Sequence, residues 1–219
     1  MVMAMASISL RRSSVIIWLS VIGLCSVIFM ILLEIKDHLI QEKKERTRYL
    51  VETAHSLIVA AHSDGLKRRL KTADAQKNGL ASLKNLRYGE NYYFWVNDGR
   101  PMMLMHPAQP DLVGKDLSAV RDTEGKVLFK EMDAIANEHG EGFLTYYWPK
   151  PGQKESVPKI SFVKYFEPWD WIVGSGAYVE DVNGLFYRYV IIFAIFVVCI
   201  ILPIACIFDR NLRKQAEGE

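Results

Sequence analysis

The chain of 219 residues lacks cysteine outside its two most apolar segments, and it lacks any marked excess of charge. The cysteines are Cys25, Cys199 and Cys206, so the long stretch between the two segments has to fold without a disulfide. The formal net charge of +2 argues against nucleic acid as a partner, because nucleic-acid-binding domains usually concentrate basic residues on one face. The histidines are scattered without a zinc-type spacing, so we expect neither a structural metal nor a cofactor.

The sequence also lacks the short motifs that mark common catalytic sites. It contains no nucleophile-elbow serine, no phosphate-binding loop and no metalloprotease helix motif. Acidic residues such as Asp98 and Asp116 stand at turns beside Gly or Leu, without a pairing pattern. We therefore predict that the protein is not an enzyme.

Two long runs without charged residues do occur, at residues 15–33 and 189–208. At about 1.5 Å per residue, each run just spans a hydrocarbon core about 30 Å thick, which predicts two transmembrane helices. Pro203 in the second run is tolerated because membrane helices can satisfy the freed backbone groups locally. A cleaved signal peptide is the alternative for the first run, but this run is longer than usual and no small-residue cleavage site follows it.

Short basic flanks predict the orientation of these two helices. Arg11 and Arg12 precede the first run, and Arg210, Arg213 and Lys214 follow the second. Because positive residues accumulate in short cytoplasmic flanks, we expect both termini in the cytoplasm of an inner (plasma) membrane protein. The predicted segments are a cytoplasmic N-terminus at 1–14, a span at 15–33, an extracytoplasmic domain at 34–188, a span at 189–208 and a cytoplasmic tail at 209–219.

The predicted extracytoplasmic domain begins with helices. Apolar residues at helical spacing predict a long amphipathic helix from Ile35 to about Ala61, and we interpret its charged stretch as a solvated face rather than a lipid contact. The stretch His62–Gly65 is expected to interrupt this helix. A second helix is predicted to about Leu86, with Thr72 as its N-cap.

The rest of the domain alternates as strands do, apart from one helix. The predicted order is a hairpin, a helix that ends before Gly140, and three further strands. A short helix from Asp181 to Arg188 is expected to lead into the second span. The ranges are 92–97 and 102–106 for the hairpin, 126–139 for the helix, and 143–148, 160–166 and 171–179 for the later strands. The fold class is thus α+β, with an antiparallel sheet of about five strands against a long N-terminal helix.

Short motifs follow one another between about residues 45 and 182: Arg87-Tyr-Gly, Tyr93-Phe-Trp-Val-Asn-Asp, Met105-His-Pro, Gly114-Lys-Asp-Leu, Trp148-Pro-Lys-Pro, Pro168-Trp-Asp-Trp and Gly174-Ser-Gly-Ala-Tyr-Val-Glu-Asp. Their order and spacing resemble the single-Cache domain of the second subtype. The resemblance implies a PAS-like fold with a ligand cavity between a curved sheet and its covering loops. It also implies the extracytoplasmic sensor of a bacterial chemoreceptor or sensor kinase, some of which bind short carboxylic acids.

Strand alternation indicates which side chains could line such a cavity. Lys159 within a strand could meet a carboxylate, although a solvated lysine is the usual alternative. His106 could donate to a ligand or serve a structural role, and Met105 could be an adaptable wall or core filler. The predicted ligand-binding residues are Tyr93, Trp95, Met105, His106, Tyr146, Trp148, Lys159 and Tyr165.

These features predict a membrane-anchored sensor that binds a small organic acid and signals through its transmembrane helices. It would act as a homodimer or with a signalling partner, without nucleic acid. The alternative is a non-enzymatic accessory subunit that regulates a partner membrane protein and has a degenerate pocket. Receptors of the resembling family continue beyond the second span, where this sequence has only the short tail 209–219. We therefore expect either the sensor part of a longer receptor or a subunit that acts through a partner.

Overall fold

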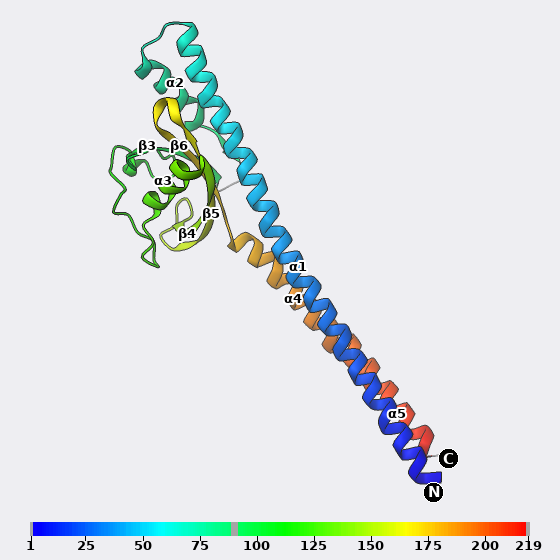
Figure 1. Cartoon of the computed structure of the whole chain (residues 1–219). Coiled ribbons are helices and arrows are strands. Elements are labelled where there is room, and N and C mark those ends of the chain that lie inside the picture. Colours follow the sequence, from blue (N-terminus) through cyan, green and yellow to red (C-terminus); the bar gives the residue numbers. More distant parts are fainter. Residues whose placement is uncertain (1, 89–91, 218–219) are drawn as a thin grey trace. The chain divides into compact units, whose positions relative to one another are not determined.

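The computed structural model describes residues 2–88 and 92–217 (Figure 1). The chain divides into two compact units. One unit comprises Met1–Leu39 with Val182–Glu219, and the other comprises Ile40–Asp181.

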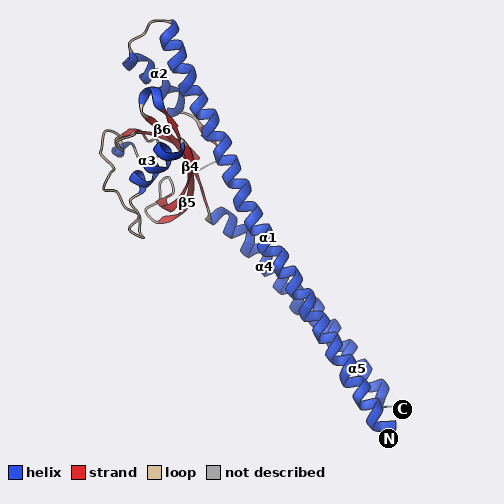
Figure 2. Cartoon of the chain, viewed as in Figure 1, coloured by secondary structure: helices blue, strands red, loops and turns tan. Residues whose placement is uncertain are grey.

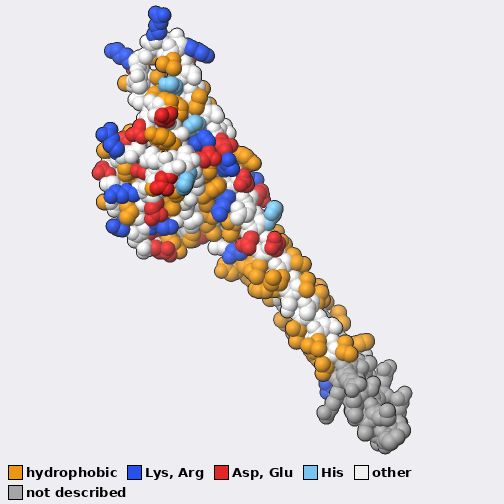
Figure 3. All heavy atoms as spheres, in the orientation of Figure 1, with side chains coloured by type: hydrophobic (Ala, Val, Ile, Leu, Met, Phe, Trp, Pro, Cys, Tyr) orange, Lys and Arg blue, Asp and Glu red, His pale blue; other side chains and the backbone are white. Residues whose placement is uncertain are grey.

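The first unit consists of helical segments. These are the N-terminal part of α1 (Val2–Lys67), α4 (Glu180–Phe196), the π-helical turn η3 (Val197–Ile201) and α5 (Leu202–Glu217). Two of the helices are long and apolar enough, by length and composition, to cross a membrane. Figure 3 shows hydrophobic side chains along them.

The wide turn η3 stands immediately before Pro203. Proline has no N–H to donate, and its ring clashes with the carbonyl of the residue four positions earlier in a regular α-helix. That residue, Cys199, lies inside the π-helical turn, where the wider winding moves its carbonyl away from the ring. The helix therefore continues past the proline, as the sequence predicts.

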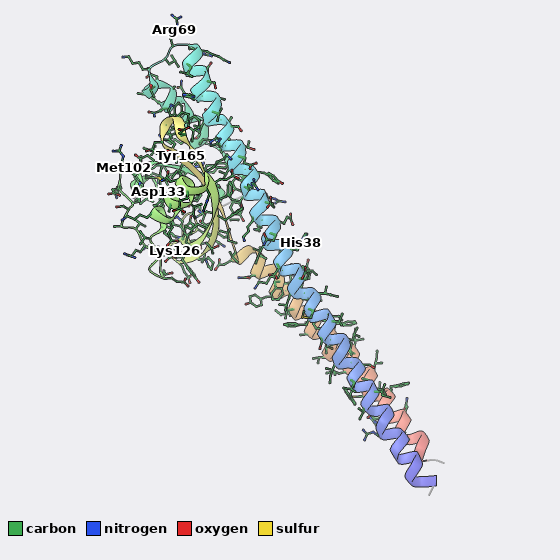
Figure 4. The ribbon with its side chains drawn as sticks, viewed as in Figure 1. His38, Arg69, Met102, Lys126, Asp133 and Tyr165 are labelled. Atoms are coloured by element: carbon green, nitrogen blue, oxygen red, sulfur yellow. The ribbon has the colours of Figure 1, made fainter. Side chains whose placement is uncertain are left out.

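The second unit begins with the remainder of α1, which runs without a break to Lys67. The expected interruption at His62–Gly65 is therefore wrong. Gly65 lies inside the helix, at a point where α2 packs closely against it. A Cβ at this position would collide with the Cβ of Ala75 on α2. The role of Gly65 is to let α1 and α2 approach each other closely. The chain turns after α1 at Arg69, which has a φ of 53° (labelled in Figure 4).

Helix α2 spans Thr72–Lys84. The N-cap is Lys71, which has extended backbone angles and makes no side-chain capping bond, so the prediction of Thr72 as N-cap is wrong by one residue. Asp74 lies in the first turn of α2, where a carboxylate interacts favourably with the helix dipole.

A six-stranded antiparallel sheet follows, in the order β1-β2-β6-β5-β4, with β3 paired to β2. The hairpin of β2 and β3 and the three later strands confirm the sequence prediction. The short strand β1 was not predicted. The bounds are β1 Arg87–Tyr88, β2 Tyr92–Asp98, β3 Met103–Met105, β4 Glu141–Pro149, β5 Ser156–Phe166 and β6 Trp171–Tyr178.

Helix α3 spans Leu128–His139 and ends at Gly140, whose φ of 77° is the left-handed conformation that commonly stops a helix. Two short 3-10 helices, η1 (Pro110–Leu112) and η2 (Glu167–Trp169), lie in the connections. Figure 2 shows α3 over one face of the sheet and the outer part of α1 along the other.

The sheet therefore has a hydrophobic cluster on each face. The α1-side cluster joins α1 and α2 to β2, β5 and β6, and it contains Trp169 and Trp171 with ring centroids 4.7 Å apart. Both tryptophans are core residues. The α3-side cluster joins α3 to aromatic residues of the sheet. The candidate site lies in this second cluster.

Candidate functional site

The site is built from alternate residues of β2, β4 and β5, which place their side chains on the α3 side of the sheet. Tyr93 and Trp95 come from β2, and Tyr146 and Trp148 come from β4. Lys159 comes from β5, where it pairs with Tyr146 on one side and with a residue of β6 on the other. Strands that are far apart in sequence thus bring one cation into an aromatic surrounding.

Lys159 is the central polar residue of this group and is only 1% exposed. Its Nζ donates to the hydroxyl oxygen of Tyr93 at 3.1 Å. The same Nζ lies 4.4 Å from the ring centroid of Tyr93, 5.1 Å from that of Trp95 and 5.3 Å from that of Tyr178. Burial lowers the pKa of Lys159 from 10.5 to about 7. Among the described residues, no carboxylate forms an ion pair with Lys159 that would offset this loss of solvation.

Two glycines of β6 create the room for these side chains. A Cβ at Gly174 would collide with the indole ring of Trp95. A Cβ at Gly176 would collide with the hydroxyl of Ser161 and the Cε of Lys159. The glycines thus allow these side chains to approach the backbone of β6 closely, which is a common role of glycine inside a strand.

Trp95 also leaves a hydrogen-bond donor unused. Its Nε1 is buried and has no partner among the described residues. A buried N–H without an acceptor is costly and uncommon in native structures. It is therefore a candidate donor to a bound molecule.

His106 follows the end of β3 and is 3% exposed. Its ring centroid lies 4.9 Å from that of Tyr93 and 6.2 Å from that of Trp148. The backbone N–H of Gln109 donates to His106 Nδ1 at 2.9 Å, so in the neutral ring the proton is on Nε2. Burial, with a smaller contribution from the charge of Lys159, lowers the pKa of His106 to about 3. His106 is therefore a neutral donor through Nε2.

The remaining predicted residues divide into two groups. Tyr146 is buried and its hydroxyl lies 3.0 Å from Ser161 Oγ, and Trp148 packs edge-on against Tyr146. These two belong to the aromatic group. Met105, by contrast, packs in the α1-side cluster, so its placement on the pocket wall is wrong.

Tyr165 (labelled in Figure 4) lies at the margin of the α3-side cluster, where its hydroxyl donates to Asp170 Oδ1 at 3.0 Å. The structure therefore does not bring Tyr165 to Lys159. Its position near the end of β5 explains the difference, because strand alternation gives the face of a residue and not its depth.

Sequence reasoning missed Tyr178, which is 1% exposed and contacts the Lys159 ammonium with its ring. Alternation along β6 could have identified it, since Gly174, Gly176 and Tyr178 share one face. Sequence reasoning also missed the cover supplied by α3, whose buried residues Leu128, Phe129 and Met132 pack in the same cluster. No local signal in the sequence indicates which strands α3 covers.

A second buried polar group lies on α3. Asn97 Nδ2 donates to Asp133 Oδ1 at 3.1 Å, and Asn97 Oδ1 is buried without a partner among the described residues. Burial, with smaller contributions from Asp98 and Asp170, raises the pKa of Asp133 to about 7. Figure 4 labels Asp133 on α3.

A hydrogen-bond chain crosses the sheet from the aromatic group toward α1. Ser175 Oγ donates to the backbone oxygen of Tyr93 at 2.7 Å and lies 2.7 Å from the hydroxyl of Tyr88. Tyr88 stacks on Tyr92, whose hydroxyl accepts a hydrogen bond from Lys43 of α1 at 3.1 Å. Hydrogen bonds and one ring stack therefore connect the backbone of Tyr93 to α1 on the opposite face.

Comparison with known families finds that the model of the single Cache domain 2 matches residues 39–191. The methyl-accepting chemotaxis protein McpP of Pseudomonas putida is 42% identical over 180 residues, which are 81% of this chain and 33% of McpP. The sensor histidine kinase MctS of Rhizobium johnstonii is 34% identical over 108 residues, which are 49% of this chain and 23% of MctS. The chain thus spans a third or less of the length of these relatives.

Two solved structures are similar to the second unit. A periplasmic sensor domain of a chemotaxis protein has a TM-score of 0.62 and 45% identity, covering 64% of this chain and 97% of that domain. A Cache chemosensory domain solved for carboxylic acid recognition has a TM-score of 0.63 and 42% identity, covering 65% of this chain and 97% of that domain.

Proposed function

The chain belongs to the single Cache domain 2 family, and from this premise we propose that its extracytoplasmic domain senses a short-chain monocarboxylate. The observation that carries the proposal is the buried cation of Lys159, which lies among aromatic rings without a carboxylate partner in the described part of the chain. A buried ammonium is strongly disfavoured unless an opposite charge meets it. A carboxylate bound beside Nζ would supply that charge.

If one carboxylate oxygen of the ligand meets Lys159 Nζ, the neighbouring hydrogen-bond donors can bind the other oxygen. His106 can donate through Nε2, and Trp95 has an unused Nε1–H. Both side chains belong with Lys159 to the ring contacts around Tyr93. Fixed donors within apolar walls are the usual means by which a cavity binds and orients a small anion.

The walls favour a small acid with a single charge. Tyr93, Trp95, Tyr146 and Trp148 surround Lys159 with bulky rings, and we propose that they admit only a short chain of about two to four carbons. Lys159 is the only buried lysine or arginine among the residues whose burial is described, so a second carboxylate would enter the site unpaired. The solved Cache domain that recognises carboxylic acids supports this choice of ligand.

We propose that binding is transmitted through α1 and α4 to a signalling partner or output module. The relatives support this role, since they are a chemotaxis protein and a sensor histidine kinase. The series of hydrogen bonds from Tyr93 through Ser175 to Tyr88 offers a route by which a structural change at the pocket reaches the α1 side of the sheet. We further propose that the protein works as a homodimer or with such a partner.

The proposed location is the inner membrane, with residues 34–188 outside and both termini in the cytoplasm. Reporter fusions at residues 100 and 214 test this arrangement. We expect the two reporters to indicate opposite sides of the membrane. The same side for both would contradict the two-span arrangement.

Calorimetric titration of the full chain in detergent with acetate, propionate, pyruvate and lactate tests the ligand. A charge-assisted hydrogen bond contributes about 1.5–3 kcal/mol, so Lys159→Ala should weaken binding by about tenfold to a hundredfold. His106→Ala should weaken it less, because a neutral imidazole makes an ordinary hydrogen bond. Trp171→Ala is the control, since it removes core packing on the other face of the sheet and leaves the pocket contacts in place.

Two results would count against the proposal. If Lys159→Ala folds and binds as tightly as the unmodified chain, Lys159 is not the ligand's partner. If none of the acids binds at millimolar concentration, the pocket does not sense a monocarboxylate, and regulation of a partner membrane protein becomes the better explanation.

A further inference from the structure

The cation of the proposed site is surrounded by groups that carry no compensating charge. Tyr93 from β2, Tyr146 from β4 and Tyr178 from β6 face Lys159, and His106 faces it from the segment after β3. Burial raises the pKa of Tyr93 and Tyr146, the latter well above its ordinary value, so both stay neutral at physiological pH. The lowered pKa of His106 keeps the imidazole neutral as well.

The cover above the site adds no charge to Lys159. Helix α3 contributes Leu128, Phe129 and Met132, which are apolar. The carboxyl of Asp133 on the same helix accepts from Asn97, and it is not among the causes that shift the pKa of Lys159.

We infer, on the basis of the proposed function, that the site takes up one proton together with the acid, and that Lys159 Nζ receives it. Without a ligand the buried amine meets rings and one hydroxyl but no carboxylate among the described residues, so its neutral form is favoured. A bound carboxylate beside Nζ favours the ammonium form instead. The bound pair is then R–COO⁻ with Lys159–NH₃⁺, and the additional proton comes from the buffer.

This linkage makes the affinity depend on pH with a definite sign. Since the pKa of Lys159 is about 7 in the empty site and higher in the complex, affinity falls as the pH rises above about 7. Between about pH 6 and about pH 8.5, the dissociation constant should increase by about 30-fold. The ligand itself does not contribute, because a simple carboxylic acid is fully ionised throughout this range.

Titration calorimetry of the full chain in detergent, with acetate as the probe, measures the proton directly. Repeating the titration in buffers of different ionisation enthalpy gives the number of protons taken up per acetate. We expect about 0.1 near pH 6, about 0.5 near pH 7 and about 1 near pH 8.5. Uptake that does not increase with pH would overturn the inference.

Two variants assign the proton to Lys159. His106→Gln removes the other titratable ring but keeps an amide that can donate and accept, so proton uptake should persist. Lys159→Arg keeps a permanent charge, so its uptake should fall to zero and its affinity should not change with pH. If His106→Gln loses the uptake, the proton belongs to His106 and the inference is wrong. The His106→Gln result decides this point even if Lys159→Arg fails to fold.

The outcomes separate this inference from the function on which it rests. Acetate binding with constant affinity and no proton uptake would refute the proton linkage alone. The absence of binding by acetate and by the other three acids, at every pH tested, would refute the proposed function and the linkage together.

Discussion

Replacement of Lys159 by methionine should stabilise the ligand-free protein and weaken its binding of an acid. Methionine has a similar length and an apolar, flexible side chain, so it can occupy the space between Tyr93, Trp95 and Tyr178 without a charge. Replacing buried charged groups by well-packed apolar residues is often neutral or stabilising. The buried lysine would therefore reduce the stability of the fold while serving to bind the ligand.

The size of the effect follows from the pKa of Lys159. A decrease from 10.5 to about 7 corresponds to about 5 kcal/mol, since one pKa unit is about 1.36 kcal/mol. Because the folded pKa is lowered, this destabilisation is fully present below about pH 7 and disappears as the pH rises to about 10.5. After about 1–2 kcal/mol is subtracted for lost contacts with the rings, Lys159→Met should stabilise by about 3 kcal/mol at neutral pH.

Thermal unfolding of the full chain in detergent, followed by tryptophan fluorescence, measures this difference. About 3 kcal/mol should raise the midpoint by about 6–12 °C near pH 7, and the gain should shrink near pH 10. Lys164→Met is the matched control on the same strand. Lys164 is partly exposed and pairs with Glu141, so its replacement should give no gain.

A lower midpoint for Lys159→Met at neutral pH would refute the reasoning, because it would mean that the aromatic contacts outweigh the lost solvation. A gain of the same size near pH 7 and near pH 10 would also refute it. In that case the stabilisation would come from packing and not from the charge.

Three further predictions concern other residues of this unit. Ser175→Ala should lower the free energy of unfolding by about 1–3 kcal/mol, because it removes a buried hydroxyl that bonds the backbone oxygen of Tyr93 and the hydroxyl of Tyr88, as measured by denaturant unfolding. Gly174→Ala should destabilise by about 1–3 kcal/mol and weaken acid binding, because the added methyl displaces Trp95, as measured by unfolding and calorimetry. Asp133→Asn should stabilise the protein near pH 8 and have little effect near pH 4, as measured by unfolding at both pH values. The pKa of Asp133 is raised from 3.8 in the unfolded state to about 7 in the folded state. Its burial therefore destabilises the fold only above about pH 4, and fully only above about pH 7.

Each of these has an outcome that would contradict it. If Ser175→Ala is as stable as the unmodified protein, the hydrogen bonds of Ser175 to Tyr93 and Tyr88 do not contribute to the stability of the fold. Full stability and affinity of Gly174→Ala would mean that Trp95 can move away easily. A gain for Asp133→Asn that is equal at both pH values would exclude the charge of Asp133 as its cause.

Much of the second unit could be predicted because its signals are local. β-forming residues between turn signals identified β2, β4, β5 and β6, and the glycine at position 140 correctly marked the end of α3. Strand alternation placed Lys159 on one face with the tyrosines and tryptophans of neighbouring strands. These predictions succeeded because the direction of a strand side chain depends only on its own backbone.

The errors arose where contacts between distant segments decide the structure. Gly65 was interpreted as a helix breaker, but it lies inside α1 because α2 packs against it. Met105 was placed on the pocket wall, but it packs toward α1. Alternation along β6 gives the face of Tyr178, but only the pairing of β5 with β6 places its ring beside Lys159.

The two apolar segments, the α+β domain without a disulfide, and the aromatic and basic residues from which a pocket could form are all properties of the sequence alone. Those properties depend on composition and on spacing along the chain. The burial of Lys159, with no carboxylate partner among the residues that the structure describes, follows only from the folded arrangement, as does the pairing of the partly exposed Lys164 on the same strand. Solvation and pairing decide the charge of a lysine, and both depend on what β2, β6 and α3 place around it in space.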